Sequence, residues 1–353
     1  NDINVTASSA DRSGRVSDTL SFPCISMTLI INLPVMPSGK ISIEMKTRLS
    51  FREKEAVCQQ KFSNLKNIYH ACTPENHPVI FITEEDFKTA ITLLGICLHR
   101  YGKLRLLTFE LMSNHLHLVI IGEKSDISDM FEEYKRLLHK CILNDRSRSQ
   151  LKDFSLKLHE INDLENLRNV IAYVNRNGSV IDENHSPFSY PWGANRFYFN
   201  PEATCRHMTQ KRQLRVLECR TITRSRKYDD VGSLFSVDGY LSPVSFCEIT
   251  KGEEFFRDAR QYFFKISRNI ESYEQIARII GENIYYSDSD LFQIACRLSQ
   301  NEFNCRLPHM LAKDAKIKLA KTLHYEYNAG IKQVQRMLKI DMYTLKAIFG
   351  STL

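Results

Sequence analysis

The chain lacks the features that mark several classes of protein. None of its apolar runs reaches the roughly 20 residues that a membrane-spanning helix requires. Only 13 glycines and 10 prolines occur in 353 residues, which excludes collagen-like and low-complexity chains. The ten cysteines form no Cys-x-x-Cys pair and no zinc-finger spacing. Scattered cysteines are typical of reduced thiols, so we expect a cytoplasmic protein without membrane association.

A large charge surplus is also lacking, because 48 Lys and Arg stand against 41 Asp and Glu. A surplus of seven does not by itself indicate nucleic-acid binding. The basic residues gather between positions 205 and 227, where Glu218 is the one acidic residue. The candidates for phosphate contacts in this run are Arg206, Lys211, Arg212, Arg215, Arg224 and Arg226. A solvated surface explains such a run as well as a polyanion site does, and both interpretations stay open here.

The length predicts about two domains, at roughly 150 residues for each domain. Residues 1–45 are rich in Ser, Asp and Thr and predict a disordered or non-native extension. We expect an α+β domain over 46–200, a basic linker over 201–252 and a helical domain over 253–353.

Local patterns between residues 65 and 200 alternate between strands and helices. Residues 78–82 predict a short strand, and Thr83 then caps a helix that ends near Tyr101. The stretch 104–121 has the strongest strand pattern in the chain and predicts two strands joined near 111–114. The class is therefore α+β rather than all-helical.

Helices dominate the rest of the expected pattern. Residues 128–143 predict an amphipathic helix, and residues 164–176 predict another that ends at Asn177-Gly178. Aromatic residues and prolines make 186–199 an irregular segment. Six further helices are expected after Gly252, at 253–268, 272–281, 288–299, 313–327, 330–338 and 341–349.

His115 and His117 are the first residues whose spacing suggests chemistry. On a strand, side chains at i and i+2 point to the same face, so the two imidazoles project together. Two neutral imidazoles form half of a divalent-metal site, and the third ligand must come from elsewhere. Taken alone, the pair fits two partly exposed histidines on an ordinary sheet face better than it fits a metal site.

The context of this pair is an ordered series of short motifs. The series reads Ile80-Phe81, Glu85-Asp86-Phe87, a helix, Tyr101-Gly102 and Met112-Ser113-Asn114-His115-Leu116-His117-Leu118. Two later blocks read Tyr173-Val174-Asn175-Arg176-Asn177 and Pro187-Phe188-Ser189-Tyr190-Pro191-Trp192. Over about residues 66–200 the chain resembles the REP-associated tyrosine transposases, which are HUH-type enzymes related to single-strand insertion-sequence transposases. Ser113 and Gly178 stand where that family commonly has proline, and Leu116 stands where it has valine.

This resemblance implies a ferredoxin-like catalytic domain, an antiparallel sheet with helices on one face, that cuts single-stranded or hairpin DNA. Tyr173 would be the nucleophile and would leave a covalent 5′-phosphotyrosine and a free 3′-hydroxyl. A tyrosine hydroxyl is a poor nucleophile at its usual pKa of about 10, so the attack needs a metal, Mg²⁺ or Mn²⁺, at the phosphate. Tyr173 and Asn177 are i and i+4 on a helix, so Asn177 is the candidate that completes the metal site of His115 and His117.

Two alternatives concern the tyrosine itself. Tyr173 lies beside Val170 and Val174 and also fits a core aromatic residue. Tyr134 is another helical tyrosine after the histidine pair, but Leu138 stands at its i+4 position. We expect Tyr134 to pack in the core or to stack on DNA rather than to react.

The last three expected helices resemble a helix-turn-helix DNA-binding unit. Its contact candidates are Lys332, Gln333, Arg336, Lys339, Tyr343 and Lys346. Small three-helix units also serve as protein docking modules, which is the alternative for this end of the chain.

Two other functions compete with the transposase. One is a DNA-binding regulator derived from a transposase that no longer cuts, which Gly178 and the long helical extension leave open. The other is a metal-dependent hydrolase that uses only the histidines. The sequence does not distinguish a monomer from a homodimer.

Overall fold

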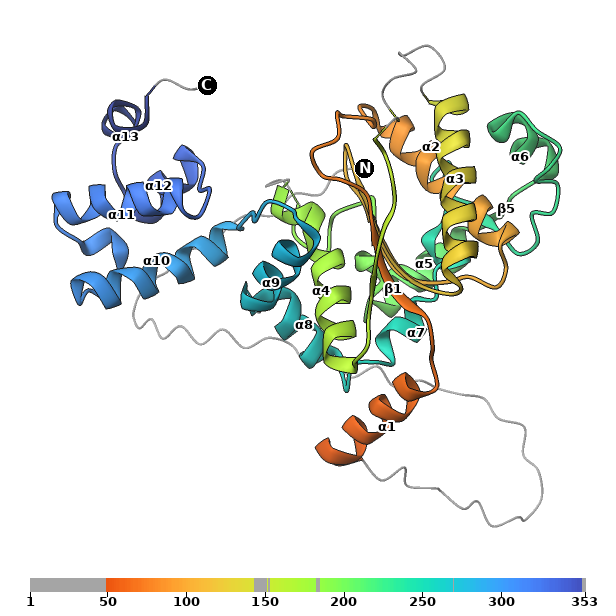
Figure 1. Cartoon of the computed structure of the whole chain (residues 1–353), viewed down its shortest axis with the longest axis horizontal. Helices are drawn as coiled ribbons and strands as arrows, with labels where there is room; N and C mark the ends of the chain where they lie inside the picture. The colour runs from red at the N-terminus through yellow and green to blue at the C-terminus, as the bar shows by residue number, and fades with distance from the viewer. Residues whose placement is uncertain (1–48, 143–150, 152, 182–184, 269, 351–353) are drawn as a thin grey trace, which may run out of the picture. The chain divides into compact units, whose positions relative to one another are not determined.

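The computed structural model describes residues 49–142, 151, 153–181, 185–268 and 270–350 (Figure 1). The predicted extension over residues 1–45 lies outside these described residues. The described chain is mixed α+β, with small antiparallel sheets and many helices, and it begins with helix α1 (Phe51–Ser63). None of the described helices is both long and apolar enough to cross a membrane.

The larger sheet has four strands. They are β1 (Ile68–Cys72), β2 (Arg105–Leu111), β3 (Leu116–Ile121) and β4 (Lys157–Glu160). Their order is β2-β3-β1-β4, and every neighbouring pair is antiparallel. In this register Glu110 of β2 and Cys72 of β1 flank His117 of β3. The histidine therefore lies in one of the two inner strands.

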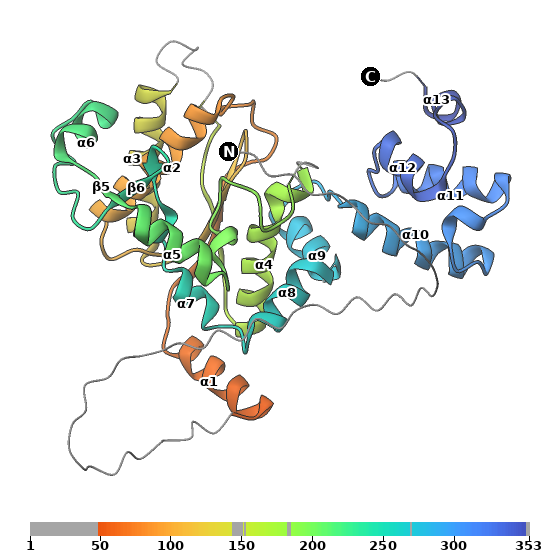
Figure 2. The same cartoon turned by 180° about the vertical axis from the view of Figure 1, so that it is seen from behind.

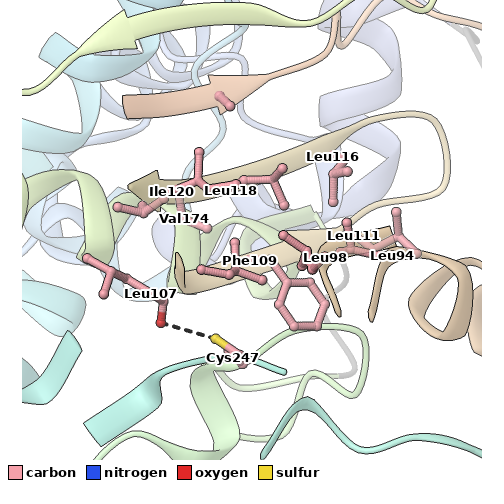
Figure 3. Packing of buried hydrophobic residues seen from close by; sticks show 14 of the residues in the cluster. Leu94, Leu98, Leu107, Phe109, Leu111, Leu116, Leu118, Ile120, Val174 and Cys247 are labelled. Atoms are coloured by element: carbon pink, nitrogen blue, oxygen red, sulfur yellow. Dashed lines mark hydrogen bonds between the residues drawn. The ribbon is translucent and has the colours of Figure 1, made fainter. Parts of the chain in front are cut away.

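Helices cover both faces of this sheet. α2 (Glu84–Arg100) and α3 (Lys124–Cys141) pack together on one side of β1, and α4 (Leu164–Ile181) lies on the other side (Figures 1 and 2). The strands β1, β2 and β3 are buried on both faces for this reason, whereas the edge strand β4 is partly exposed. Figure 3 draws part of the core, where Leu94 and Leu98 of α2 belong to one cluster with Phe109 of β2 and Leu118 of β3.

The segment 201–252 is folded, which corrects the expectation of a linker. It contains α5 (Pro201–Gln210), α6 (Val216–Thr223), α7 (Ile249–Glu253) and a small sheet of β5 (Arg212–Gln213), β6 (Phe235–Val237) and β7 (Tyr240–Leu241). Leu214, Cys219 and Leu241 from this segment are buried in the same core as the larger sheet. The Sγ of Cys247 donates a hydrogen bond to the Leu107 carbonyl of β2 at 3.2 Å (Figure 3).

The helices after Gly252 divide between two hydrophobic cores. α8 (Ala259–Arg268) and α9 (Ile270–Ile280) contribute to the core of the larger sheet. A second core joins α10 (Asp288–Phe303), α11 (Lys313–Tyr325), α12 (Ile331–Leu338) and α13 (Met342–Phe349). The second core begins at Tyr286, so the division between cores falls about 30 residues after the predicted boundary at 253. Short 3₁₀ turns lie at Asn195–Phe197, Pro243–Ser245 and Pro308–Met310.

Three of the predicted elements are wrong in detail. The predicted helix over 253–268 is interrupted, because turns and bends at 254–258 separate α7 from α8. Residues 78–82 form no strand, because the amides of Ile80 and Phe81 both donate to the single carbonyl of Ser113 instead of to a strand ladder. α4 continues to Ile181, four residues beyond the predicted end at Asn177. Gly178 does not end the helix: a Cβ at this position would clash with the side chains of Tyr190 and Glu110. Close packing explains this glycine better than a cap does.

Candidate metal centre and nucleophile

His115 and His117 lie on the face of the larger sheet that α4 covers. His115 directly precedes β3 and His117 lies within it. Both side chains are buried, and their ring centroids are 5.0 Å apart. The strand therefore brings the two imidazoles together.

Hydrogen bonding orients His115. Its Nδ1 lies 2.7 Å from the Oδ1 of Asn114, whose own Nδ2 donates to the carbonyls of Glu75 and His77. An amide oxygen only accepts, so Nδ1 of His115 carries the proton and Nε2 keeps its lone pair. The Nε2 atom is therefore the one that can bind a metal.

His117 is oriented by a third histidine that the sequence did not single out. Its Nδ1 lies 3.2 Å from the Nε2 of His70 in β1. Burial lowers the pKa of His70 to about 3 and that of His115 to about 4, and it lowers the pKa of His117 well below its usual value. The three rings are therefore neutral, which is the form in which imidazole binds metal ions.

α4 carries Asn177 to this site. Its Nδ2 lies 3.0 Å from the Nε2 of His117, and its Oδ1 accepts a hydrogen bond from the Tyr273 hydroxyl at 3.3 Å. An amide nitrogen is no metal ligand, so Asn177 would bind an ion only after its terminal amide rotates by half a turn. Its position fits the predicted site, whereas its present orientation does not.

Tyr173 reaches the same site one turn earlier on α4. Its hydroxyl donates a hydrogen bond to Oε2 of Glu282, and its ring meets that of His117 edge-on at 5.7 Å. The ring of Tyr273 from α9 stacks on it at 5.0 Å. Only 2% of Tyr173 is exposed, and burial together with Glu282 raises its pKa well above the usual value. The hydroxyl is therefore protonated and covered by α9.

Glu282 is the residue at this site that sequence reasoning missed. It follows the end of α9 after Gly281, a glycine with a φ of +79°. Its Oε1 lies 3.4 Å from the Nε2 of His117, and burial raises its pKa to about 7. Because 109 residues separate it from Tyr173, no local motif could have linked the two.

A second group of possible ligands shares His117. It consists of His70, Cys72 and His117, all of them buried. Burial raises the pKa of the Cys72 thiol to about 12, so this sulfur is protonated near neutral pH. Thiolates favour soft metals, whereas the group of His115, His117 and Glu282 offers nitrogen and oxygen to harder ions. The group of His115, His117 and Glu282 is therefore the better candidate for Mn²⁺.

Tyr134 lies in the core of the α+β part. It is fully buried among α3 neighbours such as Phe131, and burial raises its pKa well above the usual value. In the described chain its hydroxyl has no hydrogen-bond partner. The structure agrees with a packing role and gives it no access to DNA.

Three of the six basic candidates after position 205 lie on the surface close to carboxylates. Arg206 pairs with Glu202 at 3.6 Å. Arg212 and Arg215 both bind Glu218, and these contacts lower the pKa of that carboxylate to about 2. Paired arginines of this kind have part of their charge neutralised before any phosphate arrives.

The remaining three candidates in this run are also exposed. Lys211 lies 5.6 Å from the ring centre of Phe235, and Arg224 donates to the carbonyl of Lys140 at 3.4 Å. Arg226 lies near Asp229 and lowers the pKa of that carboxylate, after the larger effect of Arg220. The run is therefore a surface with both signs of charge rather than a uniform basic track.

The helix-turn-helix candidates divide into two groups. Gln333 and Arg336 bind Asp288 at the start of α10, with Arg336 Nε 2.6 Å from its Oδ2. These two side chains hold α12 against α10 and have a structural role already. The others are exposed to solvent: Lys332, Lys339, Tyr343 and Lys346.

Comparison of the chain with protein-family models, with curated protein sequences and with solved structures returned no match.

Proposed function

We propose that this chain is a metal-dependent tyrosine transposase of the HUH type, which nicks and rejoins single-stranded or hairpin DNA. The observation that carries the proposal is the convergence of His115, His117, Tyr173 and Asn177 from β3 and α4 at one buried point. Both histidines are neutral and offer an Nε2 lone pair toward the side on which Tyr173 and Asn177 lie. A core aromatic residue would need none of these polar neighbours.

The arrangement of the larger sheet supports the same proposal. The antiparallel order β2-β3-β1-β4 and the chain order β1-α2-β2-β3-α3-β4 are the features that lead us to propose a ferredoxin-like arrangement. α4 then covers the free face and brings Tyr173 to the histidines. We propose that this part of the chain is the catalytic domain.

The proposed reaction transfers one phosphodiester bond to the protein. A divalent ion held by His115, His117 and an oxygen ligand would polarise the non-bridging phosphate oxygens. The hydroxyl oxygen of Tyr173 attacks phosphorus, the bond to the 3′-oxygen breaks, and the proton lost by tyrosine balances the one gained by the 3′-hydroxyl. The 5′-phosphotyrosine keeps the energy of the broken bond, so a second 3′-hydroxyl can reverse the step elsewhere.

Movement of α9 is a requirement of this reaction. Tyr173 is 2% exposed beneath Tyr273 and Glu282, so a phosphodiester contacts the hydroxyl only after this cover is displaced. The same burial favours the second candidate function, a DNA-binding regulator that retains the site without using it. The two candidates differ in one product, a covalent bond between Tyr173 and DNA.

Replacing both histidines tests the metal centre. We expect the His115→Ala, His117→Ala double variant to lose metal-dependent nicking of single-stranded hairpin DNA, because both nitrogen ligands of the proposed site are removed. The assay measures cleaved DNA after incubation with Mg²⁺ or Mn²⁺. Variant His207→Ala is the matched control, since this buried histidine hydrogen-bonds Ser242 and lies outside the site. Nicking by the double variant at the wild-type rate would contradict the proposal.

The helical end supplies the proposed contacts to duplex or hairpin DNA. We expect the triple variant Lys332→Gln, Lys339→Gln, Lys346→Gln of the full chain to bind DNA more weakly. Each lost phosphate contact should lower the slope of log affinity against log salt by about one. Fluorescence anisotropy over a series of salt concentrations measures both quantities.

The control replaces three exposed lysines of the α+β part, Lys66, Lys103 and Lys124. They lie at or near the opposite ends of the strands from His115, so this variant should keep the salt slope of the wild type. An unchanged slope in the helical-end variant would favour protein docking for α11 to α13.

For the oligomeric state we propose a monomer or a homodimer.

A further inference from the structure

The histidine pair needs an oxygen ligand, and two side chains compete for that role. Asn177 and Glu282 both lie within 3.4 Å of the Nε2 of His117. Glu282 comes from the connection between α9 and α10, outside the part of the chain that carries the histidine motif. If Asn177 binds the metal, α4 completes the site. If Glu282 binds it, the connection between α9 and α10 completes the site.

The ligand distances suit a carboxylate at this position. Two ligands about 2.1 Å from one ion lie about 3.0 Å apart in octahedral geometry and about 3.4 Å apart in tetrahedral geometry. The Nε2 of His117 and the Oε1 of Glu282 are 3.4 Å apart. The ligand atoms of His115, His117 and Glu282 all lie within 4.8 Å of one another. A small inward movement of the side chains therefore accommodates one ion.

The chemistry of the two candidates differs further. Asn177 presents its Nδ2 to the site, while its oxygen is engaged by the hydroxyl of Tyr273. Glu282 presents an oxygen that is ready to coordinate. Its other oxygen accepts from Tyr173, so a single carboxylate touches both the histidine site and the tyrosine.

Burial adds an independent argument. The Glu282 side chain is only 6% exposed, and its nearest basic partner is His117. A neutral imidazole cannot compensate a buried carboxylate, and a buried charge is costly unless a cation or a metal compensates it. A divalent ion between the three side chains supplies that charge.

We infer that Glu282 is the carboxylate ligand of the metal in the DNA-free protein, completing a site of two histidines and one carboxylate with His115 and His117. The inference rests on the proposed function, because it assumes that the histidine pair binds a divalent ion. Two imidazoles and one carboxylate suit Mn²⁺ better than Mg²⁺, which prefers oxygen ligands. The α9–α10 connection is therefore part of the metal centre as well as its cover.

The test measures metal binding rather than catalysis. The full chain is stripped with a chelator and titrated with Mn²⁺ in the absence of DNA, and the electron paramagnetic resonance signal of free Mn²⁺ reports binding. We expect Glu282→Gln to weaken Mn²⁺ binding by about tenfold or more. Replacing even a residue that only hydrogen-bonds a metal ligand typically lowers metal affinity by about 10- to 100-fold. Glu282→Asp keeps the charge on a shorter side chain and should lose less affinity than Glu282→Gln.

Glu75→Gln is the matched control. Glu75 accepts hydrogen bonds from Asn283 and Tyr285 and so holds the same connection, but it belongs to neither ligand group. Its replacement should leave Mn²⁺ affinity at the wild-type value. Equal losses of Mn²⁺ affinity in Glu75→Gln and Glu282→Gln would overturn the inference. The position of the α9–α10 connection, rather than coordination of the metal by Glu282, would then explain both losses.

Failure of the inference and failure of the proposed function give different results. Wild-type affinity in Glu282→Gln, with binding lost in the His115→Ala, His117→Ala variant, overturns only the role of Glu282. Absence of Mn²⁺ binding by the wild type, or full binding by the double histidine variant, overturns the metal centre itself. Circular dichroism of each variant confirms that the helices are retained.

Discussion

A protein–DNA adduct that survives denaturation is expected when the metal-loaded protein meets single-stranded hairpin DNA labelled on the 3′ side of the cut. The label must lie there because attack by Tyr173 leaves the 5′-phosphate on the protein. Tyr173→Phe should abolish the adduct completely, since the phenyl ring has no oxygen to attack phosphorus. The ring packing against Tyr273 and His117 stays almost unchanged, so DNA binding should be retained. Gel electrophoresis and mass mapping of the labelled peptide measure the result.

Two control variants, together with the products observed, assign the outcome to one function. Tyr134→Phe should leave the adduct intact, because that hydroxyl is fully buried in the core. Asn177→Ala should slow adduct formation without stopping it, since the two histidines and Glu282 still hold an ion. Nicking without an adduct would favour the hydrolase. Binding without nicking, in wild type as in Tyr173→Phe, would favour the regulator.

Local chemistry made part of the fold predictable. The predicted helix after Thr83 is confirmed, because Thr83 and Asp86 form a reciprocal capping box at its start. The predicted pair of strands within 104–121 is confirmed as β2 and β3, with the turn where it was expected. The helices after residue 270 agree with their predicted bounds to within a few residues, since their apolar spacing reflects the face that each one buries.

Long-range packing explains what the sequence could not predict. The strand β1 has five consecutive buried residues and therefore lacks the alternation that marks a half-exposed strand. Its His70, the partner of His117, was missed for that reason. Glu282 could not be found because its role depends on how α9 lies against α4, which no short window of sequence contains. The His-x-His and Tyr-x-x-x-Asn spacings are local, so they could be recognised in the sequence alone.

The sequence predicted the charge of the surface around residues 205–227 only in part. Sequence counting found one acidic residue among the basic residues of 205–227, but carboxylates from outside this run also approach it. Asp229 binds Arg220, and Glu133 of α3 binds Lys227 at 2.8 Å. Pairing across the fold thus reduces the positive potential that the composition of the run predicts.

Replacement of Arg176 is expected to cause the largest loss of stability. Arg176 of α4 forms a buried ion pair with Asp290 of α10, and its guanidinium lies 4.8 Å from the ring centre of Tyr273. Asp290 also accepts from the backbone amide and hydroxyl of Ser287 at the start of α10. Arg176→Met keeps the length of the side chain but leaves a buried carboxylate without its cation. Breaking a buried pair in this way costs about 3–5 kcal/mol.

A nearby exposed pair provides the comparison. Arg336 binds Asp288, two residues before Asp290, with side chains that are 40% and 43% exposed. Arg336→Met should therefore cost only about 0–1 kcal/mol. Urea unfolding followed by circular dichroism and by the fluorescence of Trp192, the single tryptophan, measures both variants. Equal losses of stability in the two variants would contradict the larger contribution expected from the buried pair.

Since α9 and Glu282 lie in the chain between α4 and α10, loss of the Arg176 pair should also weaken Mn²⁺ binding, whereas Arg336→Met should not.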